Sequence, residues 1–196
     1  TLTNSNDVKF EYSAQTNAAT VINLTNHAYF NLQGYDKGHL QEHEFKISAS
    51  HYVVADSSGM PTGAVEPVRG TDLDLTHWKN IYTTINEPTD PAIIRAQGYD
   101  HCYCLDNQGE LVEVAFARSE NVQLSCATTL PGVQFYTGNF LGNTPINDNQ
   151  HYDSYGAFCF EPGFWPDSPN HAHFPDCRFD KSRPYNAIIE YRFTEL

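Results

Sequence analysis

Basic residues are scarce in this chain of 196 residues. Lysine and arginine together number 11, against 24 aspartates and glutamates, which gives a formal net charge of −13. Nucleic acids and anionic membranes are bound through basic patches, so this balance argues against both as partners. The arginines are also scattered along the sequence, which disfavours a phosphorylated substrate. Neutral polyols remain as natural ligands, and the abundant tyrosines and phenylalanines suit a site that stacks sugar rings.

The sequence also lacks a long apolar run and a signal-peptide pattern. It therefore predicts no membrane-spanning segment, and we expect a cytoplasmic protein. The chain begins at Thr1 rather than at a methionine. We expect from this that a leader or a longer N-terminal region has been removed.

Cysteines are few and odd in number, which argues against a disulfide framework. Most of them lie inside strand-like runs, so we expect buried, reduced thiols. The spacing Cys102-x-Cys104 is neither that of a redox pair nor that of a zinc knuckle. The five cysteines are Cys102, Cys104, Cys126, Cys159 and Cys177.

Helical periodicity is weak, and alternation of apolar and polar residues dominates. The best short helix candidate spans residues 74–80. Turn-forming residues separate the strand candidates, at 56–59, 106–109, 131–132 and 141–145, and the polar stretch 144–155 is predicted to be an exposed loop. No repeat or linker divides the chain, so we predict one all-β antiparallel sandwich domain over residues 1–196. The strand candidates are 8–12, 20–24, 45–47, 51–55, 92–96, 99–105, 111–116, 122–128, 133–137, 156–161 and 187–193.

Glu161 is the only charged residue in the apolar, aromatic run 156–166. Burying an unpaired carboxylate is costly, so such a residue is either satisfied by specific donors or kept for chemistry. Desolvation would raise its pKa toward neutrality, where a general base works best. The alternative is a structural carboxylate that backbone donors or a nearby arginine satisfy.

His27 lies among aromatic residues and amides in the segment 25–32. A histidine acid facing a glutamate base would suit proton transfer to and from a neutral, hydroxyl-rich substrate. The alternative is a core histidine with satisfied hydrogen bonds.

Three further segments carry polar groups that suit a site. Residues 98–103 place Asp100 and His101 at the start of a strand, and residues 131–140 offer the amides of Gln134 and Asn139. We expect His101 to be a structural neighbour that can also line the pocket. The third segment, 165–175, is a proline-rich loop that we expect to shape the pocket mouth.

Two features of this region have alternative interpretations. His171-x-His173 with Cys177 invites a metal site, but no second pair of ligands accompanies them, so we predict no metal there. Trp78 and Trp165 could stack on a sugar, although a core role for at least one of them is the simpler expectation.

The order of these motifs resembles the galactose mutarotase, or aldose 1-epimerase, family. The resemblance covers essentially the whole chain. It implies the large antiparallel β-sandwich of that family (the galactose mutarotase-like supersandwich) and an isomerase that interconverts the α and β anomers of free hexoses such as galactose and glucose. The motifs are Thr-Asn-His-x-Tyr-Phe-Asn-Leu at 25–32, Gly-Tyr-Asp-His at 98–101, Gln-Phe-Tyr-Thr-Gly-Asn-Phe-Leu at 134–141, Glu161, and Pro-Asp-Ser-Pro-Asn-His at 166–171.

The resemblance also implies a role for each matching residue. Glu161 matches the base that takes the proton of the anomeric hydroxyl, and His27 matches the acid that protonates the ring oxygen. Asp100 matches the carboxylate that holds sugar hydroxyls, while Gln134 and Asn26 are predicted to contact the sugar. Paired proton transfers meet the developing charges, so we expect no metal and no cofactor.

No segment before Thr25 resembles the N-terminal part of the family, which supplies an arginine and another histidine to the sugar site. The chain thus resembles a C-terminal portion of the usual protein. A companion N-terminal fragment, self-association by strand exchange or a naturally truncated protein would each fit. Two other functions stay open: a hexose-6-phosphate 1-epimerase, which needs a cationic phosphate site, and a sugar-binding module without turnover.

Overall fold

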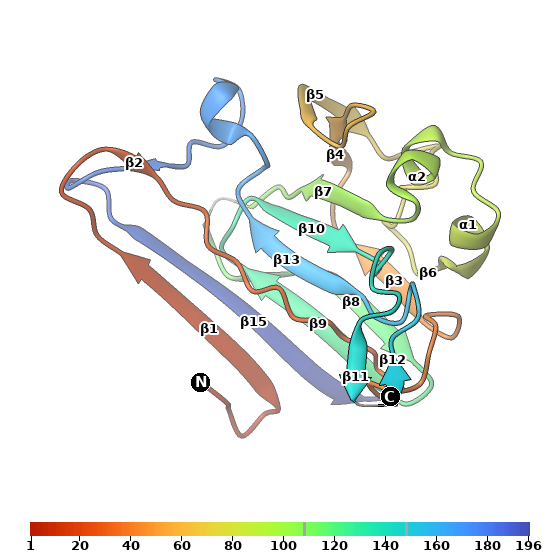
Figure 1. Ribbon diagram of the computed structural model, residues 1–196. Coiled ribbons are helices and arrows are strands. Elements are labelled where there is room, and N and C mark those ends of the chain that lie inside the picture. The colour runs from red at the N-terminus through yellow and green to blue at the C-terminus, as the bar shows by residue number, and fades with distance from the viewer. Residues whose placement is uncertain (108, 148) are drawn as a thin grey trace.

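Antiparallel strands dominate the computed structural model, which describes residues 1–107, 109–147 and 149–196 (Figure 1). The larger sheet has six strands in the order β1-β15-β9-β8-β3-β6. Every strand pair in the described part of the chain is antiparallel. The strands of this sheet are β1 (Asp7–Ala14), β3 (Glu44–Ile47), β6 (Lys79–Asn80), β8 (Val112–Ser119), β9 (Val122–Thr128) and β15 (Tyr185–Glu195).

The second sheet has five strands in the order β13-β10-β7-β4-β5. Two short pairs complete the fold: β2 (Thr20–Val21) with β14 (Arg178–Phe179), and β11 (Pro145–Asn147) with β12 (Gln150–His151). The second pair lies in the stretch predicted as an exposed loop; Asp148 of that loop and Gln108 of the predicted turn lie outside the described residues. The five strands are β4 (His51–Ala55), β5 (Pro61–Pro67), β7 (Asp100–Cys104), β10 (Gly132–Tyr136) and β13 (Cys159–Gly163).

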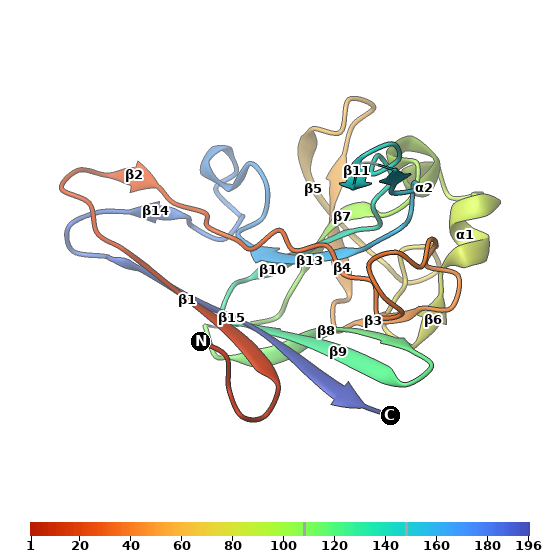
Figure 2. The same cartoon turned by 60° about the horizontal axis from the view of Figure 1, so that its bottom comes forward.

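The two sheets stack face to face around an aromatic core (Figure 2). The rings of Phe45, from the larger sheet, and Phe135, from the smaller, have centroids 4.9 Å apart. The buried Tyr191 hydroxyl of β15 donates a hydrogen bond of 2.6 Å to the Phe160 carbonyl of β13. The predicted all-β antiparallel sandwich is therefore confirmed.

Alternation along β10 and β13 gives the smaller sheet two unlike faces. Phe135 and Phe160 lie opposite each other in register, and both are fully buried against the larger sheet. Their neighbours Gln134 and Glu161 are also paired, and because successive side chains alternate, they point away from this core. We call this second side of the five-stranded sheet the outer face.

Two predictions about helices were wrong. Residues 74–80 form an irregular segment with a bend at 76–77 that leads into β6, because the Asp74 carboxylate accepts hydrogen bonds from the backbone and hydroxyl of Thr76, a local arrangement that competes with a helix. Residues 92–96, predicted as a strand, lie in the helix α2 (Pro91–Ala96). Asp90 caps this helix by accepting from the Ala92 amide, and Pro91 favours the first helical position.

Smaller differences concern short elements. The predicted strand 20–24 extends only over Thr20–Val21, and the helix α1 (Tyr82–Asn86) was not predicted. The edge strand β5 was also missed, because prolines at both its ends and Gly63 within it hide the alternation. Among the described residues, no helix combines the length and the apolar character needed to cross a membrane.

Candidate active site

The outer face of β7, β10 and β13 carries the polar residues singled out in the sequence. Gln134 is paired with Glu161 across β10 and β13, and Tyr136 is paired with Asp100 on one side and Cys159 on the other. Residues paired across strands, and residues two apart along a strand, point to the same side of a sheet. Three strands therefore bring these five side chains to one surface.

His27 reaches this surface from the coil that follows β2, which runs along β13 (Figure 1). Two backbone hydrogen bonds fasten that coil: the Phe30 amide donates to the Phe158 carbonyl at 2.8 Å, and the Phe158 amide donates back at 2.9 Å. As a result, Nε2 of His27 lies 3.4 Å from Oε1 of Glu161. The two residues that the sequence proposed as an acid–base pair are in direct contact.

Glu161 is a carboxylate held in a mostly desolvated position. Its side chain is only 12% exposed, whereas that of His27 is 50% exposed. Burial raises the pKa of Glu161 to about 7; the charge of His27 opposes this shift, and that of Asp100 adds to it. A carboxyl group with this pKa can both accept and return a proton near neutral pH, which a general base requires.

Asp100 and Gln134 form a second polar pair beside the first. Nε2 of Gln134 donates to Oδ1 of Asp100 at 2.6 Å. Burial raises the pKa of Asp100, while the hydrogen bond from Gln134 and the charge of His27 lower it. Oε1 of Gln134 is buried and has no hydrogen-bond partner among the described residues. This pair therefore offers unused acceptors of the kind that bind hydroxyl groups.

Asn26 has a local role in the structure. Its side-chain oxygen accepts a hydrogen bond of 3.1 Å from the Ala28 amide, which fixes the turn that carries His27. Direct contact between Asn26 and a ligand stays a prediction.

Two tyrosines that the sequence reasoning did not single out surround the acid–base pair. Tyr29 stacks on His27, with ring centroids 5.0 Å apart and planes inclined by 26°. Tyr136 meets both rings edge-on, at 6.4 Å from His27 and 6.3 Å from Tyr29. These contacts restrict the orientation of the imidazole. The signal was present in the sequence, because both tyrosines lie inside the quoted motifs next to the polar residues.

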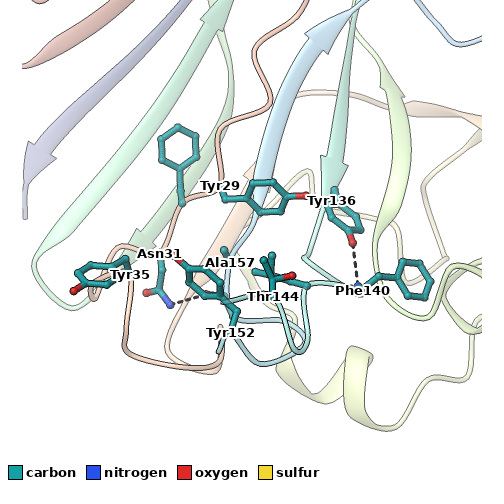
Figure 3. Close-up of a pocket in the computed structure, with 11 residues that line it drawn as sticks. Tyr29, Asn31, Tyr35, Tyr136, Phe140, Thr144, Tyr152 and Ala157 are labelled. Atoms are coloured by element: carbon teal, nitrogen blue, oxygen red, sulfur yellow. Dashed lines mark hydrogen bonds between the residues drawn. The ribbon is translucent and has the colours of Figure 1, made fainter. Parts of the chain in front are cut away.

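Three cavities adjoin these residues, and the largest does not itself reach Glu161. It holds about 620 Å³ and is lined mainly by aromatic residues, with Tyr29 and Tyr136 beside each other and Tyr152 farther along the wall (Figure 3). A cavity of about 340 Å³ includes Asp100 and Gln134, and one of about 200 Å³ includes Gln134 and Glu161. Gln134 lines both of the smaller cavities. We take the region around this shared residue, rather than the largest cavity, as the centre of the site, since proton transfer depends on contact with the reacting groups and not on cavity volume.

His101 and Asn139 make mainly structural contacts. The Nδ1 atom of His101 accepts from the Asp100 amide, and burial lowers the pKa of its imidazole to about 4, so the ring is neutral. The ring also lines the cavity of about 340 Å³. The Asn139 amide donates to the carbonyls of Ala96 and Tyr99, so it closes the loop before β7.

The proline-rich loop packs against the hairpin β4–β5. A ring nitrogen of His173 lies 2.9 Å from the Gly63 carbonyl, and Nε2 of His171 lies 3.0 Å from a carboxylate oxygen of Asp167. Within the described part of the chain, His171, His173 and Cys177 do not come close enough together to share a metal ion.

Both tryptophans have structural partners. Nε1 of Trp165 donates to the Pro131 carbonyl, and its ring packs edge-on against Phe174. The ring of Trp78 lies under the Arg118 guanidinium, 4.4 Å from the ring centroid.

Several known proteins resemble this chain in sequence. A family model described as aldose 1-epimerase matches residues 1–192. The aldose 1-epimerase of Escherichia coli K12 is 34% identical over 197 residues, which cover 98% of this chain and 56% of that protein. The galactose mutarotase of Homo sapiens is 37% identical over 187 residues, which cover 93% of this chain and 53% of that protein.

A solved structure shares the fold. The aldose epimerase homologue from C. elegans superimposes with a TM-score of 0.85 at 27% identity, over 98% of this chain and 57% of that chain. The chain thus spans about half the length of the relatives that it matches.

Proposed function

Because the chain belongs to the aldose 1-epimerase family, we propose that its outer face interconverts the α and β anomers of free aldohexoses such as galactose and glucose. The observation that carries this proposal is the contact of 3.4 Å between His27 and the desolvated carboxylate of Glu161. Ring opening needs a base at the anomeric hydroxyl and an acid at the ring oxygen. Both oxygens are bonded to the same carbon, so the base and the acid must lie close together.

The reaction proceeds through the open-chain sugar. Glu161 accepts the proton of the C1 hydroxyl while protonated His27 donates to the ring oxygen, and the bond between C1 and that oxygen breaks. The aldehyde then rotates about the bond between C1 and C2. Ring closure on the other face reverses both transfers: His27 takes its proton back, and Glu161 protonates the new hydroxyl. Each cycle restores both residues, so no co-reactant is consumed.

Asp100 and Gln134 hold the sugar in this proposal. The carboxylate of Asp100 and the unpartnered Oε1 of Gln134 accept hydrogen bonds from hydroxyl groups. Tyr29 keeps the imidazole of His27 in position and offers a flat, apolar surface to the sugar ring.

The two alternative functions have less support. A hexose-6-phosphate 1-epimerase needs cationic side chains near the sugar to bind the phosphate. Among the described residues that line the cavity of Asp100 and Gln134, Arg95 is the only lysine or arginine, and the carboxylate of Asp56, which also lines this cavity, disfavours an anion. A binding module without turnover does not need a histidine 3.4 Å from a carboxylate whose pKa burial raises to about 7.

A polarimetric assay with fresh α-glucose and α-galactose tests the proposal. We expect accelerated mutarotation by the parent, loss of that rate in Glu161→Gln, and no loss in the matched control Glu120→Gln, which changes an exposed glutamate in a turn. Because the relatives are longer, a second arm adds the N-terminal part of the E. coli relative in trans. No acceleration in either arm, or a Glu161→Gln variant with parental rate, would contradict the proposal.

A further inference from the structure

Cys159 lies on β13 two residues before Glu161 and points to the same outer face. Its thiol, a ring nitrogen of His27 and a carboxylate oxygen of Glu161 all lie within 4.8 Å of one another. In the described ranges of the chain, this is the only group of three potential ligand side chains brought so close together. We propose that these residues bind a thiophilic divalent cation such as zinc, and that the bound cation stops proton transfer.

The donor set and its spacing fit zinc. Zinc binds cysteine sulfur, histidine nitrogen and carboxylate oxygen in tetrahedral sites. With metal–ligand lengths of about 2.0–2.1 Å, a nitrogen and an oxygen at two corners of a tetrahedron lie roughly 3.4 Å apart. The observed separation between His27 and Glu161 is 3.4 Å. The thiol lies within 4.8 Å of both; with a zinc–sulfur length of about 2.3 Å the corresponding corners lie roughly 3.5 Å apart, so the thiol closes by at most about 1.3 Å to reach the third corner.

Charge balance also favours the cation. The carboxylate of Glu161 and a thiolate of Cys159 together neutralise a divalent ion, so the occupied cluster carries no net charge into a largely buried place. Burial raises the pKa of the Cys159 thiol, so the free thiol keeps its proton, but coordination to zinc removes that proton. Asp100 adds a further negative charge near Glu161.

Occupation of the cluster blocks the chemistry, and this part of the inference rests on the proposed function. The half-exposed ring of His27 gives the ion its path from solvent, because Cys159 itself is fully buried. A metal-bound imidazole nitrogen cannot donate a proton, and a metal-bound carboxylate is a weaker base. Zinc and the sugar therefore compete for the same two residues.

A neighbouring cysteine provides the matched control. Cys102 lies on the outer face of β7 and is also buried, but it packs against Val53 and Phe174. It has no histidine and carboxylate close enough to complete a site among the described residues. Substitutions at Cys102 and Cys159 thus each remove a buried thiol, of which only one lies in the proposed cluster.

Titration with Co²⁺ tests the binding site without reference to activity. We expect a sulfur-to-cobalt charge-transfer absorption that saturates at one ion per chain in the parent and in Cys102→Ala, and that is absent in Cys159→Ala. We also expect His27→Asn, a change at a half-exposed position, to weaken Co²⁺ binding at least tenfold, which keeps the test decisive if Cys159→Ala does not fold. A parent without the thiolate band, or a band that persists in Cys159→Ala, would overturn the proposal.

Inhibition is measured separately by polarimetry. We expect Zn²⁺ to slow mutarotation in competition with the sugar, and a chelator to restore the rate. Relative to its own metal-free rate, Cys159→Ala should need at least tenfold more Zn²⁺ for the same inhibition. Parental zinc sensitivity in Cys159→Ala would overturn the inference. A chain that shows the cobalt band but no mutarotation would support the metal site and refute the proposed function. A chain that catalyses mutarotation but shows no cobalt band would support the proposed function and refute the metal site.

Discussion

The two faces of the five-stranded sheet differ in how their side chains are satisfied. On the core face, Phe135 and Phe160 pack against each other with ring centroids 5.4 Å apart, and against the larger sheet. On the outer face, one position along the same strands, Gln134 has an oxygen without a partner in the described part of the chain, and Glu161 has a raised pKa. The side chains of the core face are fully packed by other side chains, whereas the outer face holds polar groups whose burial lowers the stability of the fold.

This difference separates the residues that stabilise the fold from those that serve chemistry. Buried polar groups without partners lower stability, so they persist where a ligand supplies the partner. The contrast yields a simple expectation: changes on the outer face should act on rate, and changes on the core face should act on unfolding.

The largest expected effect is on rate. We predict that His27→Asn lowers kcat by roughly 10²–10⁴-fold, because loss of one proton-transfer group leaves the ring oxygen unprotonated. The double variant His27→Asn/Glu161→Gln should be no slower than the slower single variant, since the two residues act as one unit. Initial polarimetric rates of the four proteins measure this. If the rate loss of the double variant equalled the product of the two single losses, the two residues would act independently, and the prediction would be wrong.

The core face should show the reverse behaviour. We predict that Phe160→Ala lowers the free energy of unfolding by about 3–5 kcal/mol, because it empties a fully buried aromatic position. Urea unfolding followed by circular dichroism measures the change. Phe140→Ala, at a ring that is 64% exposed, is the control and should change stability by less than about 0.5 kcal/mol. If both variants lost the same free energy of unfolding, the proposed difference between the two faces would be wrong.

A smaller effect in the opposite direction is expected for stability at Glu161. Its pKa is about 7 in the folded protein against an ordinary value of 4.5, so folding disfavours the ionised form. The parent therefore loses stability as pH rises through this window, and Glu161→Gln does not. We predict that the variant is more stable by about 1–3 kcal/mol at pH 8, with the difference vanishing below about pH 4.5. Urea unfolding at both pH values checks this, and a variant less stable at pH 8 would contradict it.

The smallest expected effect is that of chelation. Since the proposed proton transfers need no metal, EDTA should not lower the rate, and it should leave the melting temperature of Cys159→Ala, which lacks the proposed zinc ligand, unchanged. Elemental analysis of Cys159→Ala should likewise find no stoichiometric zinc, which would otherwise point to His171, His173 and Cys177. A rate that falls with EDTA and returns with zinc would give the metal a catalytic role.

The sequence predicted the class of the fold and the shared face of Gln134 and Glu161, but not the type of every element. Alternation places Gln134 and Glu161 on one side of their strands, and a lone charge in an aromatic run is a strong signal. The apolar run Ala92–Ile93–Ile94 has no such period, so a strand was predicted where a capped helix forms. The catalytic roles of these residues stay predictions.

The proximity of Cys159 to His27 could not be predicted from the sequence. The two residues lie on segments that are far apart in the chain, and the coil bearing His27 has no strand period from which to derive a register. Tyr29 lies inside a quoted motif, but its stacking on His27 could not be derived, because that contact depends on the same coil.

The hydrogen bond from Tyr191 to the Phe160 carbonyl has a consequence for the order in which the protein is made. The ribosome completes β13, which carries Glu161, before it begins β15. The newly made β13 therefore at first lacks the hydrogen bond from Tyr191, and Phe30 lacks the Tyr191 ring that packs against it. Contacts between segments distant in sequence form late, because the intervening chain must first be closed into a loop. We therefore expect the proton-transfer pair to acquire its final geometry only after β15 has emerged from the ribosome.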